Sequence, residues 1–318
     1  MNALHSRLPP LATLGPFIAL LLACAFFASQ TDRFLSAQNF SLILQQVMVV
    51  GVIAIGQTLI ILTAGIDLSC GMVMALGGIV MTKFAAAHGL PPSLAVLCGV
   101  GVCMLFGLIN GLLVTKVRLP SFIVTLGTMN IAFALTQIYS EAQTVTDLPS
   151  SMTVLGNTFL IGQTAINYGT LVMLALYALA WYALRESAPG RHVYAVGNNA
   201  EAARLTGIST HAVLLGVYVT AGFLYGVAAM LSVARTGVGD PNAGQTEALD
   251  SITAVVLGGT SLFGGRGIVI GSLVGALIVG VFRNGLTLMG VPSVYQILIT
   301  GILVILAVTT DQLSRRKA

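Results

Sequence analysis

Charged residues are scarce throughout this chain, and that scarcity limits the possible folds more than any single motif does. The 318 residues include 14 Lys and Arg and 10 Asp and Glu, which together make up 8% of the chain. Soluble domains carry roughly 25% of these residues. Hydrophobic residues account for 56% and the mean hydropathy is +0.95. The composition excludes a free-standing cytosolic enzyme, a secreted disulfide scaffold and a disordered tail, and it predicts a polytopic membrane protein.

Apolar runs of membrane-spanning length predict an all-α fold with about ten transmembrane helices, because a bilayer core needs about 20 apolar residues per helix. The expected spans are roughly 11–30, 42–63, 69–87, 93–115, 120–140, 167–184, 212–234, 250–264, 268–289 and 293–310. The short run 250–264 and the Gly-rich stretch 65–71 are candidates for broken or re-entrant segments. The first run ends in Leu22-Ala23-Cys24 and so resembles a lipoprotein signal, but the nine spans that follow favour a first transmembrane helix.

The basic residues predict that both termini are cytoplasmic, because cytoplasmic loops carry an excess of Lys and Arg. With the N-terminus inside, ten basic residues fall inside: Arg7, Lys116, Arg118, Arg185, Arg191, Arg204, Arg266, Arg315, Arg316 and Lys317. Four fall outside: Arg33, Lys83, Arg235 and Arg283. The stretch 142–166 has no Lys or Arg, as expected for an external loop.

Repeated landmarks predict an internal duplication within a single transmembrane domain that covers residues 1–318. Gly107-Leu-Ile-Asn110-Gly-Leu recurs as Gly280-Val-Phe-Arg-Asn284-Gly-Leu, and Pro120-Ser precedes a span as Pro292-Ser does. The offset covers five helices, an odd number, so the second copy is expected to insert upside down. The predicted inverted repeats are about 42–140 and 212–310. Repeats of this kind place a substrate path near the membrane midplane between the halves.

Polar side chains inside the predicted spans are the candidates for lining that path, because an unsatisfied polar group in hydrocarbon is costly. The candidate residues are Gln46, Gln57, Asp67, Asn110, Thr125, Thr128, Asn284, Gln296 and Thr300. Several share one helical face, such as the threonines of the fifth span and Ser293, Gln296 and Thr300 of the tenth. Interhelical hydrogen bonds explain such faces as well as a solute path does. Because nearly all these groups are neutral, they suit an uncharged, hydroxyl-rich substrate better than an ion.

Asp67 is the charged residue nearest to a membrane-embedded motif, Gly65-Ile-Asp-Leu-Ser69. One interpretation is that it orders a helix break or a gate. The other is that it caps the helix that starts near Ser69, where a negative charge suits the positive helix end.

Residues 185–211 form the longest predicted cytoplasmic loop. Asn198 or Asn199 is suited to cap a short helix at 200–206, which Gly207 would end. Glu201 near the start and Arg204 near the end match the helix dipole. A helix this short is not stable by itself and needs a membrane surface or a partner to pack on. It is therefore either an interfacial anchor or a docking helix for a cytoplasmic partner.

Signatures of chemistry are missing from the sequence. The chain contains no HExxH, no GxSxG, no Cys/His cluster and no basic stripe with interleaved aromatics, so we expect no metal, no cofactor, no nucleic-acid partner and no enzymatic activity. Gly259–Arg266 superficially resembles a phosphate loop but lacks the Lys-Ser/Thr ending. If transport is active, another chain must hydrolyse ATP.

Five motifs resemble one known family, the permease subunits of bacterial ATP-binding cassette sugar importers of the ribose, xylose, galactose and fructose type. The resemblance covers about residues 40–310. Its motifs are Thr63-Ala-Gly-Ile-Asp-Leu-Ser69, Pro120-Ser-Phe-Ile-Val-Thr-Leu-Gly127, Gly190-Arg-His-Val-Tyr-Ala-Val-Gly-Asn-Asn199, Ala202-Ala-Arg-Leu-Thr-Gly-Ile208 and Leu257-Gly-Gly-Thr-Ser-Leu-Phe-Gly-Gly-Arg-Gly267. The family usually has Ser-Val-Gly where this chain has Ser69-Cys70-Gly71, which we expect to matter little because Cys is small and apolar.

The resemblance implies a multi-pass protein of the bacterial inner membrane that works with several partners. These are a second permease copy, identical or not, two cytoplasmic ATPase domains and an external sugar-binding protein, in contact with membrane lipid. The resemblance matches Gly197, Asn198, Glu201, Arg204 and Gly207 to the loop that docks on the ATPase. It places the outer segment 235–250, with Asp240, Glu247 and Asp250, near the binding-protein face.

The function expected from the sequence is therefore that of a permease subunit that moves a monosaccharide into the cytoplasm. An ion-coupled secondary transporter also uses inverted repeats, but it should carry an embedded acidic pair, which is not evident here. A passive channel would not need the 190–208 loop.

Overall fold

The computed structural model describes residues 11–315, a mainly helical protein. Arg7, Arg316 and Lys317, which the topology prediction used, lie outside the described residues, as does the side chain of Arg315. The α-helices are α1 (Leu11–Gln30), α2 (Ala37–Leu62), α3 (Cys70–Ala86), α4 (Pro92–Thr115), α5 (Ser121–Ser140), α6 (Tyr168–Glu186), α7 (Ala188–Asn198), α8 (Ala200–Leu205), α9 (Thr210–Thr236), α10 (Glu247–Leu257), α11 (Val269–Leu288) and α12 (Ser293–Arg315).

Six helices in the described part of the chain are long and apolar enough to cross a bilayer: α2, α4, α5, α6, α9 and α11. The expected span at 250–264 is a short helix, α10, of 11 residues. At 1.5 Å per residue such a helix is about 16 Å long, roughly half of a hydrocarbon core. The protein is thus a polytopic, mainly α-helical membrane protein, and α10 is too short to cross a hydrocarbon core by itself.

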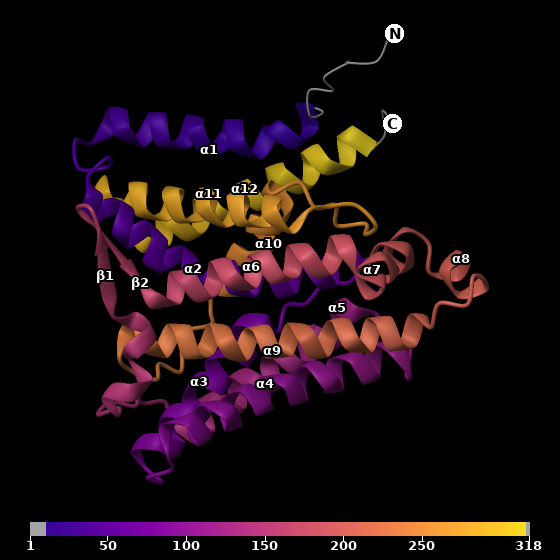
Figure 1. The fold of residues 1–318 in the computed structure, drawn as a ribbon, viewed down its shortest axis with the longest axis horizontal. Helices are drawn as coiled ribbons and strands as arrows, with labels where there is room; N and C mark the ends of the chain where they lie inside the picture. Colours follow the sequence, from indigo (N-terminus) through magenta and orange to yellow (C-terminus); the bar gives the residue numbers. More distant parts are fainter. Residues whose placement is uncertain (1–10, 316–318) are drawn as a thin grey trace.

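The long helices lie side by side with the short helix α10 among them, and the other short elements lie at the two ends of the molecule (Figure 1). Helices α7 and α8 project at one end, which is also where α1 begins and α12 ends. The opposite end carries a hairpin of β1 (Thr158–Ile161) and β2 (Thr164–Asn167), two antiparallel strands. These two ends are called the α8 end and the hairpin end below.

Two regions differ from the sequence prediction. Residues 142–166, expected as a plain loop, contain two 3₁₀ turns, η1 (Ser150–Met152) and η2 (Val154–Gly156), and strand β1. The expected loop 185–211 contains helix α7 as well as α8. The sequence did not predict α7, because Pro189 and Gly190 at its start and Gly197 near its end are poor helix formers.

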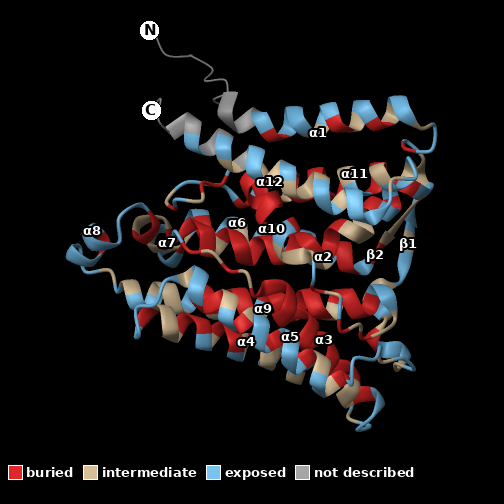
Figure 2. Cartoon of the chain, turned by 180° about the vertical axis from the view of Figure 1, so that it is seen from behind, coloured by how far each residue is buried: buried red, intermediate tan, exposed pale blue. Residues whose placement is uncertain are grey.

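Helices α2 and α9 form the centre of the molecule. About 78% of the most apolar window of α2 is buried, against 28% for α5 and for α6. Figure 2 shows the buried residues concentrated on the central helices, whereas α1 is largely exposed. Helix α2 packs on α10 and α11, and α9 packs on α3 and α4. Helices α3 and α10 in turn pack on α5 and α12, respectively.

Glycine permits the closest of these crossings. A Cβ atom at Gly107 of α4 would lie 2.3 Å from the Tyr218 carbonyl oxygen of α9, and one at Gly222 of α9 would lie 2.5 Å from the Cys103 carbonyl oxygen. Glycine at these two positions therefore lets the backbones of α4 and α9 approach closely.

Candidate functional site

Three cavities meet around Arg283 near the hairpin end. The first has a volume of about 240 Å³ and lies between α2, α9, α10 and α11. The second, of about 280 Å³, lies between α3, α9 and the segment 238–246. The third, of about 70 Å³, lies between α10, α11 and α12. Arg283 lines all three, so we call this group the Arg283 cavities.

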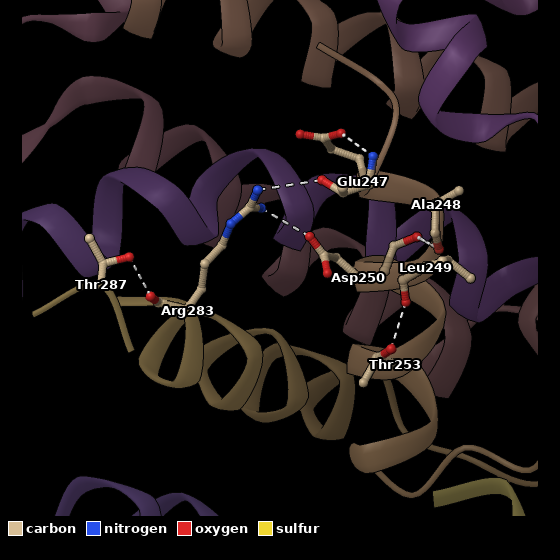
Figure 3. Close-up of polar contacts among 9 residues, drawn as sticks. Glu247, Ala248, Leu249, Asp250, Thr253, Arg283 and Thr287 are labelled. Atoms are coloured by element: carbon tan, nitrogen blue, oxygen red, sulfur yellow. Dashed lines mark hydrogen bonds and ion pairs between the residues drawn. The ribbon is translucent and has the colours of Figure 1, made fainter. Parts of the chain in front are cut away.

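Arg283 is held by the start of α10 (Figure 3). Its Nη1 donates to Asp250 Oδ2 at 3.0 Å, and its Nη2 donates to Thr246 Oγ1 at 3.4 Å. The Asp250 side chain is only 7% exposed, whereas that of Arg283 is 44% exposed. The ion pair therefore anchors the guanidinium from the buried side and leaves other N–H donors free to face the cavities.

Charged side chains of both signs line the Arg283 cavities. Arg235 and Glu247 line both larger cavities together with Arg283, Asp250 lines the first and third, and Asp240 lines the second. These residues provide two cations and three carboxylates. A site that offers charged donors and charged acceptors side by side suits a neutral polyhydroxylated solute, because hydrogen bonds to charged groups are the stronger ones.

A second polar cluster is fully buried at the break between α2 and α3. Asp67 Oδ1 accepts from Ser69 N at 2.8 Å and from Ser69 Oγ at 2.6 Å, and Asp67 Oδ2 accepts from Tyr225 Oη at 3.1 Å. Gln57 Nε2 donates to the Asp67 carbonyl and, at 3.2 Å, to Cys70 Sγ. Asp67 is 1% exposed and Gln57 is fully buried.

The cluster continues into α4 and α5. Asn110 Nδ2 donates to Ser69 Oγ at 3.1 Å, and Thr128 Oγ1 donates to Asn110 Oδ1 at 2.8 Å. Thr125 Oγ1 donates to the Ile66 carbonyl at 3.1 Å. This network, called the Asp67 network below, ties the non-helical segment 63–69 to the surrounding helices and so satisfies backbone groups that hydrocarbon would leave unpaired.

The residues predicted to line a path therefore fall into two groups. Gln57, Asp67, Asn110, Thr125 and Thr128 belong to the Asp67 network and line none of the described cavities. Gln46 lines the first Arg283 cavity, and Gln296 and Thr300 line the third. Asn284 is buried, and its Oδ1 has no hydrogen-bond partner among the described residues.

Asp67 lies just ahead of α3 and bonds Ser69, the N-cap residue, whereas no side chain caps the first turn of α3 by a hydrogen bond. The contacts therefore favour the interpretation in which Asp67 orders the break before that helix, and a role in a gate stays a prediction. The residues expected on the outer segment, Asp240, Glu247 and Asp250, all line the Arg283 cavities rather than a purely external surface.

Sequence reasoning missed the two arginines and Tyr225 as site residues. Arg235 and Arg283 were used only to count charges on each side of the membrane. A charged residue within an apolar span is itself a signal of function, and Arg283 directly precedes Asn284 in such a span. Tyr225 gave no comparable signal, because its contact with Asp67 joins residues 158 positions apart.

The residues matched to a docking loop lie at the α8 end. Asn199 caps α8 by accepting from Ala202 N at 2.9 Å, and Gly207 follows the helix with a φ of +88°. Arg204 hydrogen-bonds Glu201 at 2.5 Å, and this bond lowers the pKa of the Glu201 carboxyl. Gly197, in contrast, is buried, and a Cβ there would lie 1.7 Å from the Leu62 carbonyl oxygen. It is a packing position between α7 and the end of α2, with Asn198 exposed beside it.

Arg283→Met is expected to reduce solute uptake at least about tenfold. The substitution keeps an unbranched side chain but leaves the buried Asp250 carboxylate without its partner, which costs about 1–3 kcal/mol because solvent screens the half-exposed guanidinium. The matched control is Arg33→Met. It removes an exposed arginine at the hairpin end that does not line the Arg283 cavities. Equal uptake by both variants in cells would remove Arg283 from the site.

Comparisons with known proteins identify the family. The family described as "Branched-chain amino acid transport system / permease component" matches residues 39–308. The fructose import permease protein FrcC of Rhizobium meliloti is 46% identical over 95% of this chain and 86% of its own length. The ribose import permease protein RbsC of Bacillus subtilis is 38% identical over 94% of this chain and 92% of its own, and the D-allose permease AlsC of Escherichia coli is 35% identical over 94% and 91%. The chain therefore belongs to this family of membrane permease components, together with the sugar import permeases that it matches over nearly its whole length.

Proposed function

We propose that this chain is the transmembrane subunit of an ATP-driven importer that moves a monosaccharide into the cytoplasm. The observation that carries the proposal is the set of Arg283 cavities, which combine charged side chains of both signs with polar side chains between helices. The relatives named for fructose, ribose and allose import support it, because these solutes are neutral and rich in hydroxyl groups. Hydrolysis of ATP belongs to a separate subunit.

The proposed architecture has ten membrane-inserted helices in two inverted repeats. The packing supports the pairs α2 with α9, α3 with α10, α4 with α11 and α5 with α12. Helix α2 contacts α10 and α11 as α9 contacts α3 and α4, and α3 contacts α5 as α10 contacts α12. The α8 end is proposed to be cytoplasmic together with both termini, in agreement with the basic residues there.

The proposed path enters at the hairpin end through the Arg283 cavities and continues between α2 and α9. Gln46, Gln296 and Thr300 would donate to or accept from the solute. The Asp67 network would hold the α2–α3 break in place while the two halves rock against each other. The site itself needs only weak affinity, because an external binding protein would deliver the solute.

Three partners complete the proposal. A sugar-binding protein would dock at the hairpin end, beside the segment with Asp240. A second permease copy, identical or not, would pair with this chain. The ATPase would dock at the α8 end, where α8 carries the exposed Glu201–Arg204 pair and where Leu205 is 74% exposed.

Replacing Glu201 and Leu205 together by alanine is expected to reduce solute-stimulated ATP hydrolysis by the assembled transporter at least about fivefold. Both side chains are exposed on α8, so the change should leave the fold intact and act on docking alone. The control is Asp147→Ala, an exposed substitution far from α8. Unchanged stimulation in the α8 variant would remove this helix from the coupling.

The substrate class is tested by uptake competition in cells whose chromosomal copy of the gene is deleted, with and without a plasmid that carries the gene. Labelled fructose, ribose, xylose and allose are offered in turn, each with the others as unlabelled competitors. The proposal requires gene-dependent uptake of at least one of them. Gene-dependent uptake of amino acids alone would contradict it.

A further inference from the structure

An apolar crevice opens on the side of the molecule between α6 and α9, away from the Arg283 cavities. It has a volume of about 510 Å³, and its walls also include α2 and α7. Its lining is almost wholly apolar, with Leu59, Leu176, Ala180, Val193 and Val217 among the residues. This volume lies within the range of about 300–1,000 Å³ that ligand sites occupy.

The crevice faces the surroundings of the membrane helices rather than the interior path. Leu179 at its edge is 63% exposed and Phe223 is 40% exposed. Both lie on helices long enough to span the bilayer. The crevice is placed toward the α8 end, because it takes in the last turns of α6 and the first turns of α9.

Two residues of α7 that can carry positive charge lie at the mouth of the crevice, at the corner between α6 and α7. His192 lines the crevice directly, and Arg191 beside it in the chain is exposed, whereas Arg185 lines the neighbouring cavity with Trp181. Glu186 is the acidic residue of this corner, and it pairs with Arg185 at 3.3 Å. Arg191 Nη1 donates to the Glu186 carbonyl at 3.3 Å, so the corner retains a net positive charge.

Aromatic residues mark the same corner as a membrane boundary. Arg185 stacks over the Trp181 ring at 5.3 Å. Trp181 and Tyr194 line a neighbouring cavity on the other side of α6. Trp and Tyr are enriched where headgroups meet hydrocarbon, and basic pockets between helices on the cytoplasmic side bind anionic headgroups.

We propose that the crevice between α6 and α9 binds one acyl chain of an anionic phospholipid, whose headgroup rests on Arg191 and His192. The charge at the mouth matches an anionic headgroup, and the apolar walls match a hydrocarbon chain. The bound lipid holds α7 against α6. Helix α7 is also joined to the segment before α11 by a hydrogen bond from Tyr194 Oη to the Gly267 carbonyl at 2.9 Å. The proposal does not depend on which solute the protein transports.

Gly216 offers a clean way to fill the crevice. It lines the crevice on α9, and a Cβ there meets nothing within 4 Å. Gly216→Leu therefore brings a side chain to the crevice from a position where its Cβ is unobstructed. Gly101→Leu is the matched control, since Gly101 lies within α4 with equally open space and outside the crevice.

The test is native mass spectrometry of the purified protein with phosphatidylglycerol or phosphatidylethanolamine of identical chains. The expected result is one tightly retained phosphatidylglycerol per chain for the wild type and Gly101→Leu, and loss of that molecule for Gly216→Leu. Arg191→Gln is expected to weaken retention about fivefold, or about 1 kcal/mol for one basic residue near the headgroups. Lys116→Gln, an exposed charge removal at the end of α4, should leave retention unchanged.

Three results would overturn the proposal. One is equal retention of the two lipids by the wild type. Another is equal phosphatidylglycerol retention by Gly216→Leu and Gly101→Leu. The third is a loss of dimers in Gly216→Leu with lipid retention unchanged, which would assign the crevice to a second copy of the chain. If Gly216→Leu does not fold, the test is the comparison of Arg191→Gln with Lys116→Gln. Equal phosphatidylglycerol retention by these two variants would overturn the proposal.

Discussion

Replacing Asp67 with alanine is expected to abolish solute uptake and to lower the free energy of unfolding by about 3 kcal/mol or more. The carboxylate accepts hydrogen bonds from Ser69 N, Ser69 Oγ and Tyr225 Oη in a fully buried setting. Each buried donor left without an acceptor costs about 1–3 kcal/mol. The segment 63–69 also loses the hydrogen bond that Tyr225 of α9 makes with it.

Two further variants separate the network from a general effect of charge. Asp67→Asn keeps an oxygen that accepts from Ser69, so it should retain most of the stability and part of the uptake. Asp32→Ala removes an exposed carboxylate and should change neither. Stability is measured by titration with a denaturing detergent and uptake in cells. If Asp67→Ala behaved like Asp32→Ala, the Asp67 network would have no part in holding the α2–α3 break.

Gly107→Ala is expected to lower the free energy of unfolding by about 1–3 kcal/mol and to impair uptake, as overpacking typically does. The added Cβ would lie 2.3 Å from the Tyr218 carbonyl oxygen, and the nearest atoms are backbone rather than a flexible side chain. Helices α4 and α9 must therefore move apart, which also disturbs Tyr225, two turns further along the same face of α9.

Gly101→Ala on the same helix is expected to raise the free energy of unfolding instead. A Cβ at Gly101 meets nothing within 4 Å, so only the higher helix propensity of alanine acts, worth about 0.8–1 kcal/mol in water. Thermal unfolding of the two variants in one detergent compares them directly. Destabilisation of both by the same amount would show that the crossing of α4 and α9 does not depend on Gly107.

The helices were predictable where one local pattern decides them. The threonine face of the fifth span is the buried face of α5, with Thr125, Thr128, Ala132 and Thr136 all buried. The cap of the short helix was expected at Asn198 or Asn199, and Asn199 makes the capping hydrogen bond, while Gly207 follows the helix as expected. Both depend on neighbours within one or two turns, which the sequence displays directly.

The sequence did not predict the hairpin or α7, because tertiary contacts stabilise both. Strands of four residues are too short for a clear alternation of polar and apolar positions. Helix α7 contains Gly197 because the Leu62 carbonyl, far away in the sequence, lies too close to leave room for a Cβ atom there. Local propensity carries no information about such a contact.

The candidate site was only partly predictable for the same reason. Polar residues in spans were found as a class, but their division between the Asp67 network and the Arg283 cavities depends on which helices pack together. Tyr225 reaches Asp67 from α9, and Arg283 reaches Asp250 from α11. No spacing along the chain reveals either pair.

The most direct test of the account is solute uptake by proteoliposomes that contain this chain, with and without its ATPase subunit, binding protein and enclosed ATP. The account predicts accumulation of a monosaccharide only when all components and ATP are present, and no accumulation driven by an ion gradient. Accumulation by this chain alone under a sodium or proton gradient would contradict the account, as would free equilibration of the sugar without ATP.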